Sequence, residues 1–378
     1  AFAIFLGGPA ALFWMWATAF LGMTTKFVEV SISHKYRKQD DQGFMAGGPM
    51  YYMEYGLGMK WLAVFFAIAT VISSFGSGNM PQANNMASGI ETSFGVPTYL
   101  TGLVFAGLMG FVIVGGVRRI AAVAAALVPT MGVLYALGAF AVIFSNLDQV
   151  IPAFSSGFEY AFTGSAAAGG FLGASFAYAF NRGVNRGLYS NEAGQGSAPI
   201  AHAAAKTKEP VAEGMVAILE PFIDTLIICT LTGLVILSSG VWQEKYTTAF
   251  SQTDTEIIAG AYSDKEPEHV SQLSAHLDLM PPANDPVRAF SGTLKVEAGV
   301  PDLTNVTILH NRSVAENVRV SAQGVPFDGL MVIEEGELMD RSLNLSGESL
   351  LHSVPLTSKA FEQSFLGSYG GLLVALGL

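Results

Sequence analysis

Long apolar stretches, separated by short polar ones, fill the first two thirds of the chain. A stretch of about 20 apolar residues is long enough to cross a bilayer as a helix. Six such stretches carry few charges and lie at residues 1–25, 61–79, 98–117, 127–144, 161–180 and 215–239. A seventh begins near residue 365. The pattern predicts an all-α polytopic membrane protein, with a transmembrane core over residues 1–240 and the start of another membrane helix over residues 363–378.

Residues 241–362 have a different pattern. The runs GTLKVEAG, NVTILHN, NVRVSAQG and GLMVIEEG alternate apolar with polar residues and are bounded by Gly, Asn or Pro. These are the marks of short β-strands. We therefore expect an inserted domain over residues 241–362 that is all-β, with a β-sandwich-like part near residues 289–349.

The charges indicate how the chain is oriented. Only 13% of the residues are charged, about half the share usual in soluble domains. The eleven basic residues before residue 241, Lys26 among them, all fall in loops on one side of the predicted topology. Short loops rich in Lys and Arg stay cytoplasmic, so residues 241–362 are expected outside the cytoplasm. That segment is acidic, which argues against a nucleic-acid partner, and the single Cys229 cannot form an internal disulfide or a zinc site.

The stretch SSFGSGNMPQANN, residues 73–85, puts polar groups into an apolar helix. Asn79 and Gln82 lie on one helix face with Phe75, while Gly76, Gly78 and a nearby proline weaken the helix. Such irregular backbone is tolerated in a membrane only where it is buried in protein or lines a polar cavity. The amides suit a small zwitterion or an alkali ion, but they equally suit hydrogen bonds between helices. The stretch alone does not decide between a ligand site and hydrogen bonds between helices.

A second interruption lies in the predicted span over residues 161–180. Gly169, Gly170, Phe171 and Gly173 break a run of alanines there, and Ser175 follows. Glycine allows a helix to unwind and expose its peptide groups, and transporters bind substrates at discontinuous helices. Close packing of small residues is the alternative.

Four further residues are candidates for a gate or for coupling: Arg186, Asn191, Glu192 and Asp224. The first three lie near a cytoplasmic entrance, and plain loop structure is the alternative. Asp224 lies near the middle of the span over residues 215–239, where an acid is costly and usually functional. It is expected either to pair with Arg182 or Arg186, which we favour slightly, or to take part in ion coupling.

Several motifs resemble the bacterial sodium:alanine symporter family. They are GGPAALFWMWATAFLGMTTKFVE, GGPMYYMEYGLGMKWLA, FGSGNMPQANN, GVNRGLYSNEAGQGSAPIAHAAA and FIDTLIICTLTGLVIL. The resemblance implies two inverted five-helix repeats with broken helices, as in the amino acid/polyamine/organocation superfamily. It also implies a multi-pass protein of the bacterial inner (plasma) membrane that takes up alanine, and often glycine, with sodium. It implies no enzyme, no catalytic residue and no cofactor other than sodium as the coupling ion.

By this resemblance, residues 75–82 and the break at residues 169–173 line the substrate cavity. We expect the family's first core helix to lie before Ala1 and its eighth to continue beyond residue 378, so the core is incomplete here and the sodium ligands lie mostly outside this chain. Asn85 stands where the family commonly has Ser. Two alternatives remain: proton-coupled transport through Asp224, and a membrane-anchored sensor that works through the external β domain.

Overall fold

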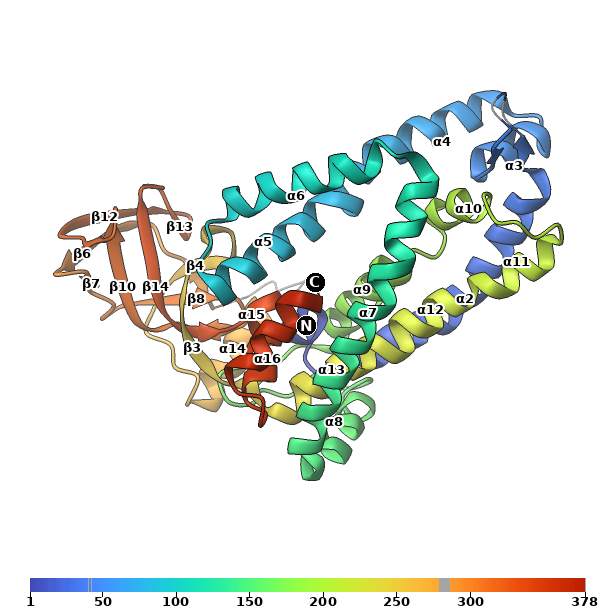
Figure 1. Cartoon of the computed structure of the whole chain (residues 1–378). Coiled ribbons are helices and arrows are strands. Elements are labelled where there is room, and N and C mark those ends of the chain that lie inside the picture. Colours follow the sequence, from blue (N-terminus) through green and yellow to red (C-terminus); the bar gives the residue numbers. More distant parts are fainter. Residues whose placement is uncertain (40, 42, 279–285, 378) are drawn as a thin grey trace. The chain divides into compact units, whose positions relative to one another are not determined.

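The computed structural model describes residues 1–39, 41, 43–278 and 286–377 (Figure 1). The chain forms two compact units. We call Ala1–Leu12, Asn146–Arg182 and Ile236–Ala360 the β unit, and Phe13–Ser145, Gly183–Val235 and Phe361–Leu378 the helical unit. Helices α2, α9 and α13 begin in one unit and end in the other, so each unit is built from distant parts of the sequence.

The helical unit holds most of the apolar helices. These elements are α2 (Ala10–Tyr36), β1 (Lys38–Gln39), β2 (Met45–Ala46), α3 (Pro49–Tyr55), α4 (Lys60–Ser73), the π-helix η1 (Ser74–Asn79), α5 (Met80–Phe94), α6 (Thr98–Ile113), α7 (Gly116–Ser145), α9 (Phe176–Asn191), α10 (Ser197–His202), α11 (Pro210–Ala217), α12 (Leu219–Pro221), the π-helix η2 (Phe222–Ile228), α13 (Cys229–Ser239) and α16 (Ser368–Gly377).

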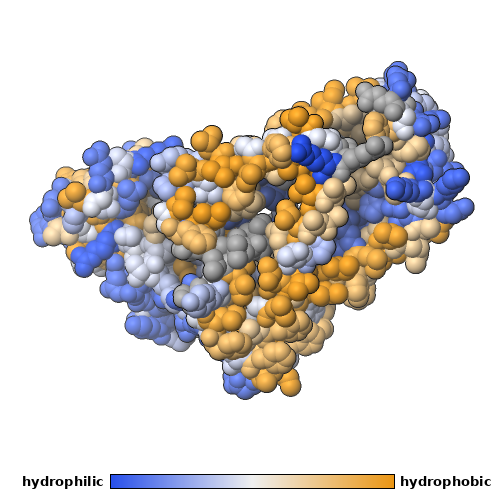
Figure 2. All heavy atoms as spheres, in the orientation of Figure 1, coloured by the Kyte–Doolittle hydropathy of each residue, from blue (hydrophilic) through white to orange (hydrophobic). Residues whose placement is uncertain are grey.

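Three helical stretches among the described residues are long and apolar enough to cross a membrane. They are Lys60–Glu91, Arg119–Ser145 and Pro210–Ser239, and Thr98–Ile113 is a shorter apolar helix. Large apolar side chains stay exposed along them, including Leu103 and Phe111 on α6 and Val133 on α7. Figure 2 shows hydrophobic side chains over the helices and hydrophilic ones over much of the strand region. Exposed apolar surface of this extent suits contact with lipid or with further protein rather than with water.

Two polar contacts fix α13 against its neighbours. The Trp16 indole on α2 donates to Thr230 Oγ1 at 2.8 Å. The Tyr135 hydroxyl on α7 lies 2.5 Å from Thr232 Oγ1. Hydroxyl and indole groups satisfy one another here inside an otherwise apolar bundle, as expected for helices that pack away from water.

The β unit begins with α1 (Phe2–Gly7) and α8 (Leu147–Glu159). After the short helix η3 (Val241–Gln243), its strands are β3 (Lys245–Ala249), β4 (Thr255–Ala259), β5 (Arg288–Ala289), β6 (Gly292–Glu297), β7 (Val300–Pro301), β8 (Val306–His310), β9 (Ser313–Val314), β10 (Glu316–Ala322), β11 (Val325–Pro326), β12 (Gly329–Glu334), β13 (Glu337–Leu338) and β14 (Leu343–Leu350), with helices η4 (Gln252–Asp254), α14 (Pro267–His276) and α15 (Ser353–Glu362). We call residues 245–350 the β domain.

The strands form three antiparallel sheets of four strands. Their orders are β11-β10-β14-β3, β13-β12-β6-β7 and β5-β4-β8-β9. Alternate side chains from all three sheets, such as Ile257, Val320 and Met331, fill one fully buried core. The alternation in the sequence therefore predicted β6, β8, β10 and β12 correctly. The insert is not all-β as expected, because it contains α14 and α15, and its first strand begins at Lys245, well before residue 289.

Three hairpins of the β domain use the same two-residue turn. Ala298–Gly299, Gln323–Gly324 and Glu335–Gly336 each join a longer strand to a short one, and both residues of each turn have positive φ. This is the type I′ arrangement, which matches the twist of antiparallel strands and needs Gly at its second position.

The predicted helix over residues 161–180 is wrong for its first fifteen residues. Residues 165–174 form a hairpin, with bridges between Ser165 and Ala174 and between Ala168 and Phe171, and α9 starts only at Phe176. Gly169 and Gly173 have φ of 56° and 88°, which the helix does not allow. We call residues 165–174 the glycine hairpin.

Candidate functional site

The polar stretch at residues 73–85 keeps its helical path and contains a π-helix. Phe75, Gly76, Gly78 and Asn79 lie on η1, and Gln82 lies on the first turn of α5. Pro81 has no N–H to give to the helix ladder, which accounts for the wider turn just before it. π-Helical turns occur frequently at functional sites.

The candidate side chains on this π-helix face outward from the helical unit. Phe75 is 63% exposed, and Asn79 and Gln82 are exposed as well. A Cβ atom added at Gly76 or Gly78 would meet nothing within 4 Å. The segment therefore offers two amides, an aromatic ring and accessible backbone on an open face of a membrane-length helix.

The second candidate group lies in the β unit. Gly169, Gly170, Phe171 and Gly173 are on the glycine hairpin, and Ser175 directly precedes α9. Phe171 is buried edge-on against Trp242, with ring centroids 5.3 Å apart. The Gly170 N–H donates to the Gln243 carbonyl at 2.6 Å. The structure thus brings these residues together with one another and with residues that follow α13.

Asp224 lies on the second π-helix, η2, which follows Pro221. Its Oδ2 atom accepts a 2.5 Å hydrogen bond from Ser190 Oγ on α9 and a 3.0 Å bond from Thr225 Oγ1. The Arg186 guanidinium lies 4.8 Å from the Tyr189 ring centroid. Within the described residues, the carboxylate is held by hydroxyl groups and has no ion pair with Arg186, contrary to the pairing that we favoured.

Asn191 and Glu192 shape the turn between α9 and α10. Asn191 has no exposed surface, and its Oδ1 accepts the Ala193 N–H at 3.0 Å. Glu192 has φ of 50°, and its carboxylate accepts a 2.5 Å bond from Ser197 Oγ at the start of α10. The SNEAGQGS sequence is therefore a turn closed by its own side chains.

The structure also contains an ion pair between a buried lysine and a half-exposed glutamate, which the sequence analysis did not predict. Helix α2 continues to Tyr36, so the assignment of Lys26 to a loop was wrong. The Lys26 side chain has no exposed surface, and its Nζ lies 3.0 Å from Glu220 Oε2 on α12. Helices α2 and α12 run side by side in Figure 1. A lysine within an otherwise apolar run was the signal for burial with a partner.

Two more contacts hold the segment from α10 to α11. The Arg37 guanidinium donates to the carbonyls of Ala203, Ala205 and Thr207 at 2.6–2.9 Å. His202 is partly buried, with its Nδ1 2.5 Å from Glu213 Oε1. A cleft of about 690 Å³ lies nearby, lined by Thr24, Thr25, Val28, Glu29, Ile32, Tyr36, Tyr52, Gly56, Leu57 and Gly194.

Comparison with known proteins gives the chain its family. The profile of the sodium:alanine symporter family matches residues 1–264. A transporter of Haemophilus influenzae is 44% identical over 259 residues, which are 68% of this chain and 57% of that protein. Sodium/alanine symporter AgcS of Methanococcus maripaludis is 45% identical over 244 residues, which are 63% of this chain and 53% of that protein. Probable sodium/glutamine symporter GlnT of Bacillus subtilis is 40% identical over 257 residues, which are 68% of this chain and 53% of that protein.

The chain spans about half the length of these relatives. The matched region includes both π-helices, the glycine hairpin and α9, and ends within the first part of the β domain. Because the family profile matches most of the chain, the chain belongs to the sodium:alanine symporter family, a family of membrane transporters.

Proposed function

We propose that the protein takes up a small neutral amino acid, alanine first and glycine second, together with sodium. The observation that carries this proposal is a pair of π-helices, η1 and η2, each lying within a membrane-length apolar helix. Both put polar groups where lipid would leave them unsatisfied. Membership of a sodium symporter family and the similarity to a relative named sodium/alanine symporter support sodium and alanine as the transported pair.

We propose that the substrate site uses Asn79 and Gln82, the Phe75 ring and the backbone at Gly76 and Gly78. An amino acid zwitterion needs acceptors for its ammonium group and donors for its carboxylate. Side-chain amides offer both, and the π-helical turn adds backbone carbonyls.

The proposed mechanism is alternating access around this site near the middle of the bilayer, in a core of two inverted repeats. Residues 1–240 would supply part of that core, residues 241–362 an extracytoplasmic insertion and residues 363–378 the start of the next membrane helix. Arg186, Asn191 and Glu192 are proposed to act at the cytoplasmic gate. The membrane is the bacterial inner membrane.

The hydroxyl partners of Asp224 favour a second candidate, coupling to protons. The Ser190 and Thr225 hydroxyls hold this carboxylate within a membrane-length apolar helix, a position where an acidic group is usually functional. In this version Asp224 would bind one proton per cycle, and sodium would have no role.

Uptake of labelled L-alanine into proteoliposomes separates these candidates. The full-length protein is given an inward sodium gradient, an equal potassium gradient, or an inward proton gradient without sodium. Sodium coupling predicts accumulation only with sodium, and competition by unlabelled glycine but much weaker competition by glutamine. Accumulation with protons alone would support the Asp224 route, and stronger competition by glutamine would contradict the proposed substrate.

A further inference from the structure

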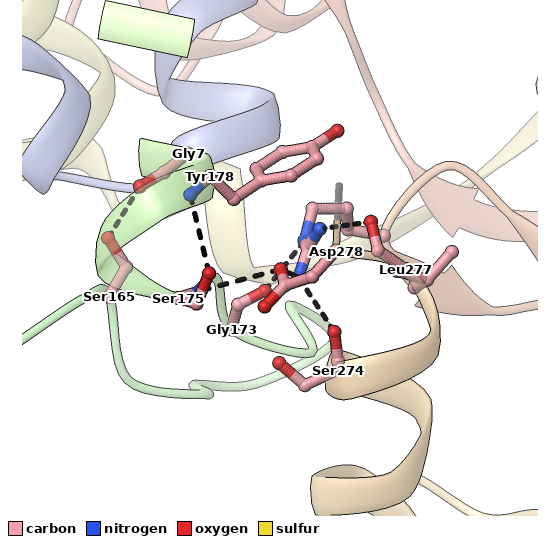
Figure 3. Close-up of polar contacts among 9 residues, drawn as sticks. Gly7, Ser165, Gly173, Ser175, Tyr178, Ser274, Leu277 and Asp278 are labelled. Carbon is pink, nitrogen blue, oxygen red and sulfur yellow. Dashed lines mark hydrogen bonds and ion pairs between the residues drawn. The ribbon is translucent and has the colours of Figure 1, made fainter. Parts of the chain in front are cut away.

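Arg312 is the largest fully buried side chain of the described residues, and it lies at the turn between β8 and β9. Its guanidinium reaches away from the strands and donates to three backbone carbonyls. These are Gly173 at 2.6 Å, Leu277 at 3.0 Å and Ser274 at 3.5 Å. Asp278 Oδ1 lies 3.3 Å from it as the counter-ion. Figure 3 shows these groups converging from the glycine hairpin and from the end of α14.

The same contacts hold the first turn of α9. Ser175 caps this helix, since its Oγ accepts the Tyr178 N–H at 3.3 Å, as serine does at helix N-termini. The Ser175 N–H in turn donates to Asp278 Oδ1 at 3.4 Å (Figure 3). The Arg312 guanidinium also lies 4.5 Å from the Tyr178 ring centroid. The β domain therefore contacts the start of α9 through its backbone, its capping residue and an aromatic side chain.

The glycine hairpin is fastened to the β domain on its other side as well. The Leu172 N–H donates to the Arg312 carbonyl at 3.0 Å. The Leu172 side chain packs in a buried cluster with Ile258, Leu273 and Leu309 of the β domain. At its first strand, Ser165 Oγ donates to the Gly7 carbonyl at 2.5 Å. The hairpin thus joins the β domain to the start of α9 and to the end of α1.

The strand core of the β domain is separate from this contact. That core is filled by residues of three sheets, such as Ile257, Val320 and Met331, and Arg312 is not part of it. Burying a guanidinium is costly unless all its donors are paired. Arginine supplies a rigid fork of five donors, which suits a site made of several carbonyls. The arrangement therefore suits arginine, and it joins the end of α14 to the glycine hairpin and to Tyr178 on the first turn of α9.

We propose that Arg312 is a positioning residue for transport, because it holds the start of α9, the helix that carries the proposed gate residues Arg186 and Asn191. The inference rests on the function proposed above. Helix α9 carries Arg186, Ser190 and Asn191 at its other end, so a shift at its first turn moves those groups too. When fewer molecules have α9 in the binding-competent position, the apparent affinity for substrate falls in proportion.

The test compares Arg312→Met with Arg319→Met in the full-length protein. Arg319 is an exposed arginine on β10 of the same domain, which makes it a matched control. Alanine uptake per transporter molecule is measured against alanine concentration. For Arg312→Met we expect KM to rise at least fivefold while kcat changes less than twofold, and for Arg319→Met no change in KM. A purely structural role would lower the number of active molecules and leave KM unchanged, so an unchanged KM overturns the proposal.

Amide hydrogen exchange on the same proteins shows where the structure loosens. Arg312→Met should lose protection by at least tenfold at residues 172–180, with no change in strands β8, β10 and β14. If protection is lost in those strands, Arg312→Lys becomes the deciding variant, because it keeps the charge but not the fork. It should raise KM at least twofold, and a wild-type KM overturns the proposal. If the wild-type protein shows no sodium-driven uptake, the proposed function fails, while the exchange experiment still tests whether Arg312 holds α9.

Discussion

Replacing His310 by glutamine should remove most of the acid sensitivity of the β domain. His310 ends β8 with 1% of its surface exposed. Its ring stacks on Phe250 with centroids 4.5 Å apart, and its Nδ1 lies 2.7 Å from Ser349 Oγ. Burial, with a smaller contribution from His352, lowers the pKa of His310 from 6.5 to about 4. The folded protein therefore favours the neutral imidazole.

The size of the effect follows from the two pKa values. Because the folded pKa lies below the unfolded one, the stabilisation is fully present above about pH 6.5 and is lost as pH falls towards 4. At pH 5 the unfolded imidazole is almost fully protonated and the folded one almost neutral. The difference removes about 2 kcal/mol of stability relative to pH 7.5, which is about 30-fold in the opening equilibrium.

Amide exchange in β8 and β14, corrected for the intrinsic effect of pH, measures this loss. The wild-type protein should lose protection about 30-fold between pH 7.5 and pH 5. His310→Gln should lose much less, and the remainder reports His352, whose pKa is also lowered by burial. An equal loss in the wild type and the variant would refute the reasoning, because it would show that other groups carry the acid sensitivity.

Three further predictions concern the helical unit and the glycine hairpin. Glu220→Gln removes the half-exposed carboxylate that pairs with the buried Lys26 ammonium and should cost about 1 kcal/mol of stability, seen as a lower thermal midpoint in detergent; a midpoint equal to the wild type would contradict a stabilising role of this ion pair. Asn79→Ala should abolish alanine uptake without changing the amount of folded protein, whereas normal uptake would make this amide a helix contact only. Gly173 has φ of 88°, and a Cβ added there would lie 3.1 Å from the Ser165 carbonyl oxygen. Gly173→Ala should therefore cost about 1–2 kcal/mol of stability and speed amide exchange at the glycine hairpin. Unaltered exchange would refute that strain.

Elements that depend on local composition were predictable. The lengths of the apolar runs gave membrane helices at Arg119–Ser145 and Pro210–Ser239. Alternation between apolar and polar residues gave the strands β6, β10 and β12. The irregular stretch around Asn79 was identified from Pro81 and its glycines, since these weaken a helix wherever it lies.

Features that depend on distant partners were not predictable in the same way. The glycine hairpin replaces a helix because its backbone groups bond to Gln243 and Arg312, which lie about 70 and 140 residues further along the chain. The pairing of Lys26 with Glu220 likewise requires knowing that α2 runs beside α12. Asp224 was identified by its depth in an apolar span, but its serine partner was not, because hydroxyl groups occur throughout the helices.

The central claim, coupled movement of sodium and alanine, is tested most directly by measuring both fluxes in the same proteoliposomes. An inward sodium gradient is used to drive labelled alanine, and an inward alanine gradient is used to drive labelled sodium. Coupling predicts that each gradient accumulates the other solute and that removing either solute stops both fluxes. Alanine entry that proceeds equally well in potassium, or an alanine gradient that moves no sodium, would contradict the account.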